Sequence, residues 1–545
     1  MLRHLSFRQR SARRNAAALL ALFAFLGCAA LAALAQPALT AASQPPGTGR
    51  ILLVLPFDNR TGQANLEWIR EAAAEILSSR FSSAGFAPLN RADRLYALDH
   101  LGLPQGFQPS RASSIKLAQT LDADSIIVGS YQTDGAAIVA QAEVVDVPHL
   151  RMGPEVTARG DMRNLVAVFD SLAWKLTRQL DANFNVAEET FVAAGAGLRL
   201  DAFEQYIRGI TEPDQSERLR HLKLAVQLSP ALSPAWMALG REYFAGEQYE
   251  QAAAAFAKVG HDAPDSLEAG FYRGLSLLYS GEYANAEKAF ADVANVLPLA
   301  EVLNNEGVAV SRRGHDGLGL FRQAEAADPN AADYHFNIAV SLKRRADAPG
   351  AQAELAQALR MHPNDPEAQA LERAWKGQPA ADSDNVRPDP LERIERRFDA
   401  QAFRQAAAMM DEMNASRLAA LSPPDRARKL AAQAKGFLDR GLLLEAERLY
   451  LDAVAADNSI AEAHAGMAEV REKTGDAADA RREAHAALDL AGSAQAYVVL
   501  GRLDLADNHL TEAGAEAGEA LKLEPGNRAA EELRRAIASR QPLKQ

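Results

Sequence analysis

Prolines recur at a nearly constant interval through the middle of the chain, and this interval constrains the fold more than any other feature. Pro230, Pro264 and Pro298 are spaced 34 residues apart, Pro329 follows 31 residues later and Pro363 another 34. Proline lacks an amide hydrogen and its ring clashes with the preceding turn, so a helix cannot continue through it. Each proline therefore predicts a turn after a helix. The interval leaves room for two helices and the turn between them.

The unit that ends at Pro264 shows both helices of such a hairpin. One face of its first helix, at the spacing i, i+3, i+4 and i+7, carries Trp236, Leu239, Gly240 and Tyr243. The second helix carries Ala252 and Phe256 one turn apart. This pattern resembles the tetratricopeptide repeat, which implies a stack of helical hairpins that binds proteins. A single hairpin cannot bury its own apolar face, so the resemblance also implies neighbouring copies.

The repeat pattern and the composition shifts around it indicate a multidomain chain, with an α/β amino-terminal domain followed by an all-α tetratricopeptide-repeat solenoid in two arrays. The expected segments are a signal peptide or membrane anchor at 1–35, a disordered tether at 36–50, an α/β domain at 51–190, a repeat array with a capping helix at 198–376, a linker at 377–390 and a second, degenerate array at 391–540.

Within the second array, residues 391–421 are interpreted as two amphipathic helices of a degenerate unit. Alanine replaces phenylalanine at the packing positions of the second array, which predicts less buried apolar area and lower stability there.

Short apolar runs predict the sheet of the α/β domain. The run 51–55 is continuous and predicts a strand buried on both faces, 125–131 predicts a second strand, and 136–147 alternates as a third. Together with 54–57 and 144–147, these stretches resemble the amino-terminal domain of the TolB and CsgG group. The resemblance implies an exported, non-enzymatic domain that contacts other envelope proteins.

The first 35 residues predict export. Five arginines and no acidic residue precede an apolar run over 17–35, in the order typical of a signal peptide, and Ala33-Leu34-Ala35 predicts cleavage before Gln36. An uncleaved anchor stays open, because about 19 apolar residues can just span a bilayer. The only cysteine, Cys28, follows Phe25-Leu26-Gly27 in a pattern that resembles a bacterial lipobox, so lipidation of Cys28 is a third outcome. All three place the protein in the periplasm or on a membrane facing it.

Composition and motifs argue against several function classes. The formal net charge of −12 is unlike that of a basic nucleic-acid binder. The α/β domain has neither a phosphate-binding loop nor a nucleophile elbow, and His100 and His149 lack metal-ligand spacing. We therefore predict no catalytic residue, no cofactor and no metal. The alternative is a small-ligand receptor or enzyme accessory that uses a loop at Asp58 and Asn59, which can equally be a turn-capping pair.

The first helices of stacked hairpins line a groove, and the residues beside their packing positions are the predicted protein-binding site. These residues are Met237, Arg241, Phe244, Phe271, Leu275, Leu278, Asn304, Phe336 and Lys343. An apolar groove with a polar edge suits an extended or helical peptide from another protein, for which envelope components are the expected source. The interpretation that Phe244, Phe271 and Phe336 pack as core between hairpins stays open. The leading hypothesis is a non-enzymatic protein-binding scaffold of the bacterial cell envelope.

Overall fold

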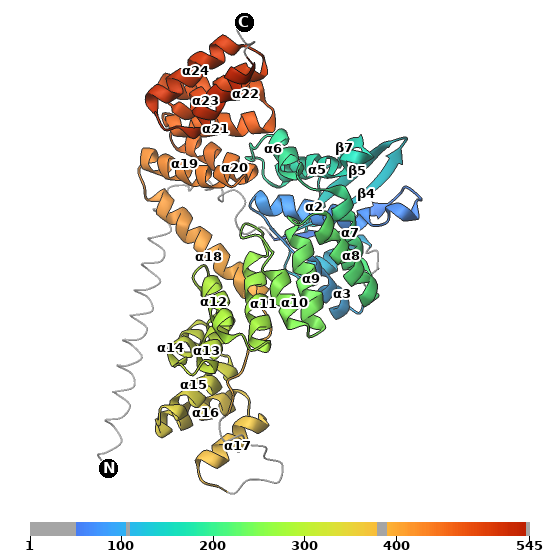
Figure 1. Cartoon of the computed structure of the whole chain (residues 1–545). Coiled ribbons are helices and arrows are strands. Elements are labelled where there is room, and N and C mark those ends of the chain that lie inside the picture. Colours follow the sequence, from blue (N-terminus) through green and yellow to red (C-terminus); the bar gives the residue numbers. More distant parts are fainter. Residues whose placement is uncertain (1–50, 105–109, 379–389, 541–545) are drawn as a thin grey trace, which may run out of the picture. The chain divides into compact units, whose positions relative to one another are not determined.

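The computed structural model describes residues 51–104, 110–378 and 390–540 (Figure 1). The predicted leader, the tether and Cys28 lie outside these residues, as does most of the predicted linker. Within the described ranges, no helix has both the length and the apolar character needed to cross a membrane.

The amino-terminal part of the described chain forms one mixed sheet. Its strands are β1 (Ile51–Val54), β2 (Asp58–Asn59), β3 (Ala87–Pro88), β4 (Ser125–Asp134), β5 (Ala137–Asp146), β6 (Arg151–Met152) and β7 (Val156–Asp161). Strand β1 pairs in parallel with β3 and β4, whereas β4 and β5 form an antiparallel hairpin. The hairpin turns at Gly135, whose φ of 63° suits glycine. Strands β6 and β7 both pair with β5.

Helices cover both faces of this sheet. Successive side chains of a strand point to opposite sides, so neighbouring residues of β1 contact different helices. Leu52 and Val54 of β1 pack in the cluster that contains α2 (Ile69–Ser83) and α5 (Leu165–Leu180). Leu53 and the following Leu55 pack in the cluster that contains α3 (Arg91–His100) and α4 (Arg111–Thr120). The predicted α/β layer structure near the amino terminus is confirmed, and the continuous apolar run follows from burial on both faces.

Helical hairpins follow the sheet. After α6 (Glu188–Gly195), the helices are α7 (Leu200–Thr211), α8 (Gln215–Leu228), α9 (Ser233–Ala245), α10 (Tyr249–Phe256), α11 (Ser266–Tyr279), α12 (Tyr283–Ala294), α13 (Ala300–Arg312), α14 (Leu318–Ala327), α15 (Ala332–Arg344), α16 (Ala348–Met361) and α17 (Pro366–Trp375). From α7 to α16, each odd-numbered helix packs on the next helix, and each pair packs on the following pair (Figure 1). The prediction of tetratricopeptide-like helical repeats is confirmed.

A second helical series begins after residue 399. It comprises α18 (Ala400–Ala419), α19 (Pro423–Asp439), α20 (Leu443–Ala456), α21 (Ala461–Thr474), α22 (Ala477–Leu490), α23 (Ala494–Ala506), α24 (Leu510–Leu523) and α25 (Arg528–Arg540). Helices α19 and α20, α21 and α22, and α23 and α24 form pairs, and α25 packs on α23 and α24. The two helices expected within 391–421 are not both present, because residues 391–399 form no helix.

Close helix approach explains the small residue in each repeat. A Cβ atom built on Gly240 would lie 2.6 Å from the ring of Phe256, so the aromatic ring of the second helix lies directly on the backbone of the first. Gly274 with Phe290 and Gly307 with Phe321 repeat this contact, whereas Gly466 of α21 meets Tyr450 of the preceding hairpin. The spacing of small and aromatic residues in the sequence therefore records the contact inside each hairpin.

One buried carboxylate joins the second helical series to α6. Glu447 of α20 accepts hydrogen bonds from the amide of Ala187, at 2.9 Å, and from the hydroxyl of Thr190, at the start of α6. Arg471 donates to the same carboxylate at 2.7 Å. Burial raises the pKa of Glu447, and these three donors act against that rise. The carboxylate thus supplies the helix amino terminus with an acceptor that α6 lacks in its own sequence.

Candidate functional site

Residues 390–399, which we call the inserted segment, run without regular secondary structure along the first helices of consecutive hairpins. They touch α11, α13 and α15 and the amino terminus of α17. We call the contacting residues of these helices the binding face; they are Phe271, Tyr272, Glu301, Asn304, Asn305, Arg312, Asp333, Phe336, Asn337, Arg344, Asp365 and Glu367. The protein therefore holds a stretch of its own chain as an extended peptide.

Two asparagines pair with the main chain of the inserted segment. The amide N–H of Arg393 donates to Oδ1 of Asn337 at 2.6 Å, and Nδ2 of Asn337 donates to the Arg393 carbonyl at 2.8 Å. Asn305 makes the same pair of bonds with Glu395, at 2.9 and 2.7 Å. The N–H and C=O of one extended residue point to the same side, and the pattern recurs every second residue. Pairing at 393 and 395 therefore requires an extended chain.

A third helix contributes a different residue at the equivalent position. Tyr272 on α11 packs against the same apolar cluster as Phe398 of the segment. Tyr272, Asn305 and Asn337 lie 33 and 32 residues apart, each two residues before the small packing residue of its helix. Equivalent positions of three successive hairpins thus lie along successive parts of one peptide. Asn304 adds a bond of 3.0 Å from its Nδ2 to the Arg393 carbonyl and accepts from Asn337 at 2.8 Å.

The side chain of Glu392 enters a site made by two arginines. Its side chain is fully buried, with Nε of Arg312 at 3.3 Å and Arg344 in contact with the other carboxylate oxygen. The same guanidinium groups also donate to main-chain carbonyls, Arg312 to Glu392 at 3.2 Å and Arg344 to Pro390 at 2.9 Å. A buried carboxylate needs such partners, because an unpaired charge would be costly to desolvate. This site selects an acidic side chain.

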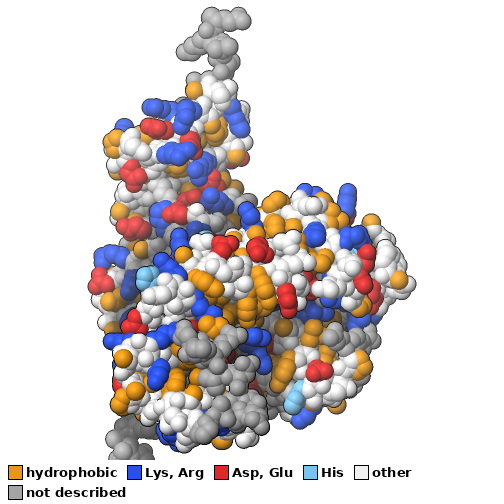
Figure 2. Space-filling model, turned by 60° about the horizontal axis from the view of Figure 1, so that its bottom comes forward, with side chains coloured by type: hydrophobic (Ala, Val, Ile, Leu, Met, Phe, Trp, Pro, Cys, Tyr) orange, Lys and Arg blue, Asp and Glu red, His pale blue; other side chains and the backbone are white. Residues whose placement is uncertain are grey.

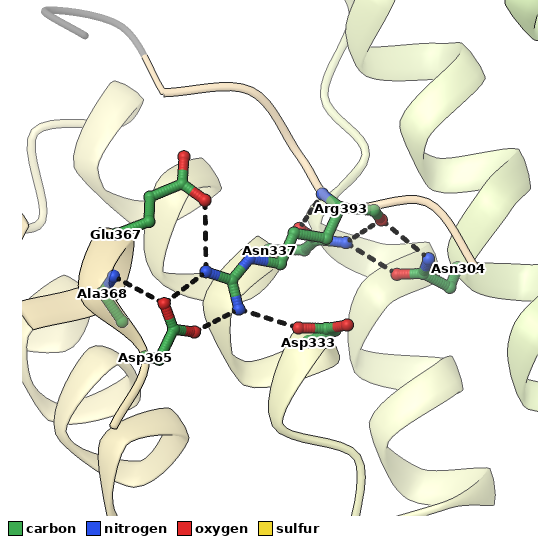
Figure 3. Close-up of polar contacts among 7 residues, drawn as sticks. All are labelled: Asn304, Asp333, Asn337, Asp365, Glu367, Ala368 and Arg393. Carbon is green, nitrogen blue, oxygen red and sulfur yellow. Dashed lines mark hydrogen bonds and ion pairs between the residues drawn. The ribbon is translucent and has the colours of Figure 1, made fainter. Parts of the chain in front are cut away.

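The next residue, Arg393, enters a site of opposite charge (Figure 3). Its guanidinium group lies 3.7 Å from the ring centre of Phe336 and donates to Asp333 at 2.8 Å. It also donates to both oxygens of Asp365, at 2.6 and 3.0 Å, and to Glu367 at 3.2 Å. Burial alone would raise the pKa of Asp365, but hydrogen bonds from Arg393 and the α17 backbone hold it below its ordinary value. This site selects a planar cation.

Apolar contacts secure the carboxyl-terminal half of the inserted segment. Ile394 and Phe398 pack on the cluster centred on α11 to α13, and the Phe398 ring centre lies 5.6 Å from that of Phe271. The amide of Asp399 donates to Glu301 at 3.0 Å, and the Asp399 side chain accepts from the amide of Ala402 at 2.8 Å. The end of the inserted segment is therefore also the start of α18.

The predicted groove residues fall into two groups in the structure. Asn304, Phe271 and Phe336 contact the inserted segment. The others make contacts within the helical stack. Met237, Leu275 and Leu278 are buried, and Phe244 packs edge-on or tilted against Tyr249, Tyr272 and Tyr279. Arg241 pairs with Glu268 at 2.6 Å, and Lys343 lies over the ring of Trp375. Core packing therefore accounts for the apolar members, except where Phe271 and Phe336 also meet the segment.

Sequence reasoning missed most of the polar binding face. Its signal was a repetition: Asp333, Asn337 and Arg344 each lie 32 residues after a residue of the same kind. Those earlier residues are Glu301, Asn305 and Arg312. An acid, an amide and an arginine at fixed places in two neighbouring hairpins are not needed for packing. A search for repeated polar residues would have found them.

The loop at Asp58 and Asn59 is organised internally. The Asn59 side chain accepts from Thr61, at 3.0 Å from its amide and 2.6 Å from its hydroxyl, and donates to the Gln63 carbonyl and to Glu67. These are the bonds of a turn-capping residue. Two surface hollows of about 410 and 180 Å³ are instead lined by residues of α4, β4, β5, β6 and their connecting loops.

One carboxylate and histidine group in the described chain has metal-like spacing. It consists of Asp504, Asp507 and His509, whose candidate ligand atoms lie within 4.8 Å of one another. Arg481 donates to both aspartates at 2.8 Å, so its guanidinium group already offsets part of their charge. The face drawn in Figure 2 shows Lys and Arg interspersed with Asp and Glu.

Comparisons with known proteins show likenesses to solved structures only. No family model matches the chain, and no curated protein matches it significantly. Similar structures include MamA from Desulfovibrio magneticus RS-1 (19% identity, 31% of this chain and 99% of that one, TM-score 0.29). YrrB, described as a TPR protein with an unusual peptide-binding site, has 16% identity over 37% of this chain and 99% of that one, with a TM-score of 0.28. The LpoB C-terminal domain from Salmonella enterica has 21% identity over 23% of this chain and 90% of that one, with a TM-score of 0.20. Because these identities and TM-scores are low, the functional proposal rests on the contacts of the binding face and not on the similarity to these structures.

Proposed function

We propose that this protein is a non-enzymatic protein-binding scaffold of the bacterial cell envelope, and that its binding face holds partner segments in extended form. The observation that carries the proposal is the double pairing of Asn305 and Asn337 with the main chain of Glu395 and Arg393. Bonds to main-chain groups provide affinity for any extended chain, and side-chain sites beside them provide selectivity. The binding face has both parts.

The remaining elements fit a scaffold with several attachment points. In this proposal, the α/β domain at 51–190, similar to that of the TolB and CsgG group, contacts envelope proteins. The hairpins at 198–376 and 391–540 act as two arrays separated by the linker, and the leader at 1–35 directs export, with or without a lipid on Cys28. The basic leader followed by an apolar run supports the location.

The binding face can be tested with partners captured in the cell. The full-length protein and its Asn305→Ala/Asn337→Ala variant would be crosslinked in intact cells, purified and compared by quantitative mass spectrometry. We expect at least one envelope protein to be enriched with the native chain and depleted at least fivefold with the variant. The matched control is Asn330→Ala, an exposed asparagine in the turn before α15. Recovery of the same proteins in equal amounts with all three chains would contradict the proposal.

A further inference from the structure

We propose that the inserted segment is a displaceable internal ligand, and that the partner is a protein with an exposed extended segment of the same chemistry. That chemistry is a glutamate followed directly by arginine and an aliphatic residue, with an aromatic residue four positions further on, as in Glu392, Arg393, Ile394 and Phe398. This inference rests on the proposed function, because it assigns the ligand and the regulation of the same binding face.

The binding face is held in place by the hairpins and does not depend on the segment. The ring of Phe321 on α14 packs against Gly307 of α13. Ala339 of α15 and Leu355 of α16 share another buried cluster. Without the segment, the polar side chains of the face would become hydrated, whereas Phe271 and Phe336 would lose the contacts that Phe398 and Arg393 make with them. The face can therefore persist empty, as a site that exchanges its occupant must.

The inserted segment combines buried anchors, at Glu392 and the paired asparagines, with outer ion-pair partners that water can reach. In its ion pairs, the side chains of Arg344, Asp333 and Glu367 are 34%, 37% and 48% exposed. Leu391 and Arg396 of the segment point to solvent. The exposed partners each contribute little, so the affinity for the segment rests on the buried Glu392 site and the two asparagine pairings. Such an occupant can be replaced by one that makes the same contacts.

Two adjacent sites of opposite charge set the direction and register of any replacement. Arg312 and Arg344 receive the first residue, and Asp333, Asp365 and Glu367 receive the next. A peptide with the order reversed would put an arginine against two arginines and a glutamate against three carboxylates. Like charges in such sites oppose binding strongly, which gives selectivity that main-chain pairing alone lacks.

Because the internal ligand occupies the binding face, it lowers the apparent affinity of every competitor by mass action. A segment joined by a short linker has an effective concentration on the order of 1 mM at its own site. If segment and competitor each bind with a Kd of about 10 μM, the segment weakens the competitor about 100-fold. Partner capture therefore requires a matching segment at high local concentration, or one with additional contacts.

A labelled peptide and full-length protein test this inference. The probe is a fluorescein-labelled peptide of residues 389–400, DPLERIERRFDA, followed by fluorescence anisotropy. The Glu392→Ala/Arg393→Ala variant weakens the internal ligand and leaves the binding face intact. We expect the probe to bind this variant at least 30-fold more tightly than the native chain. A control peptide with its first glutamate and arginine exchanged, DPLREIERRFDA, should bind at least 10-fold more weakly.

Adding Asn305→Ala/Asn337→Ala to that variant should abolish probe binding, with circular dichroism confirming that each chain remains folded. Equal probe affinity for native chain and variant, or no binding to either, would overturn the inference. In the second case, asparagine-dependent partners captured in cells would still support the proposed function, so the two failures are distinguishable. Light scattering tests a third outcome, in which the variants form dimers by exchanging their segments. Such dimers would show that the occupant of the site is a second copy of this chain, and would overturn the proposal that it is a partner protein.

Discussion

Asn337 and Arg393 lie 56 residues apart in the chain, yet the side chain of the first pairs with both main-chain groups of the second. The amide N–H of Arg393 donates to Oδ1, and its carbonyl accepts from Nδ2. An asparagine can make this pair of bonds only with an extended residue. The shape of residues 390–399 is therefore imposed by the helical face on which they lie.

Removing this amide should free the segment locally. In Asn337→Ala, the Arg393 amide loses its acceptor and the Arg393 carbonyl keeps only its bond from Asn304, at a cost of about 1–3 kcal/mol for a buried group. Hydrogen exchange followed by mass spectrometry should show amides of residues 391–399 exchanging about 5- to 160-fold faster, with α9 and α10 unchanged. Asn330→Ala, in an exposed turn, should exchange like the native chain. Unchanged exchange in Asn337→Ala would show that the segment is held without this pairing.

The two arginines at 393 and 396 should differ sharply, although they share a segment and a charge. Arg393 is paired with Asp333, Asp365 and Glu367, whereas Arg396 is exposed. Arg393→Ala should speed chymotrypsin cleavage after Phe398 by about tenfold, which corresponds to about 1.4 kcal/mol of opening free energy, and Arg396→Ala should not. Equal cleavage rates in the two variants would rule out a special role for the acidic site.

The free energy of unfolding should fall with rising pH because of a buried carboxyl group, Glu75, between α2 and α7. Burial, with Glu71 nearby, raises the pKa of Glu75 from 4.5 to about 7, and the hydroxyl of Tyr206 donates to its carboxylate at 3.1 Å. The folded chain then binds more protons than the unfolded chain between pH 4.5 and 7, so the free energy of unfolding falls across that window. Glu75→Gln stays neutral and should gain Tm relative to the native protein as pH rises from 5 to 7.5. Glu462 is exposed, and the Tm of Glu462→Gln should differ from that of the native protein by the same amount at every pH in this range.

Glu447 should be the costliest carboxylate to remove from the second helical series. Its replacement by alanine leaves Arg471 buried without this partner and the start of α6 without an acceptor. Breaking a buried pair from one side destabilises by about 3–5 kcal/mol, measured by urea unfolding. Glu462→Ala, on the exposed side of neighbouring α21, should change stability by less than about 0.5 kcal/mol. A loss of under 1 kcal/mol in Glu447→Ala would show that this joint is weak.

Replacing either of two helical glycines by alanine should change the stability in opposite directions. A Cβ atom at Gly240 would lie 2.6 Å from Phe256, so alanine should destabilise by about 1–3 kcal/mol as the hairpin opens. Gly514 in α24 has nothing within 4 Å of such an atom, and alanine there should stabilise by about 0.5–1 kcal/mol. Thermal unfolding of both variants gives the comparison. A stabilised Gly240→Ala would contradict the close approach of the two helices.

Much of the fold was predictable because its signals are local. Leu52 to Leu55 are all apolar because the strand is covered on both faces, and Gly240 with Phe256 records one contact inside one hairpin. Such patterns span less than 20 residues and recur with the period of the element. The apolar groove residues were chosen from the same periodicity, which cannot tell a core side chain such as Leu275 from a binding one such as Phe271.

By itself, the sequence determined the hairpins, the sheet and the repetition of polar residues at 305 and 337. Only the tertiary structure decided what those residues bind. Glu395 finds its partner in Asn305, 90 residues earlier, and no local pattern specifies a contact at that separation. Residues 390–399 have the composition of a helix-forming stretch, and they are extended because bonds to distant asparagines and arginines outweigh that local preference.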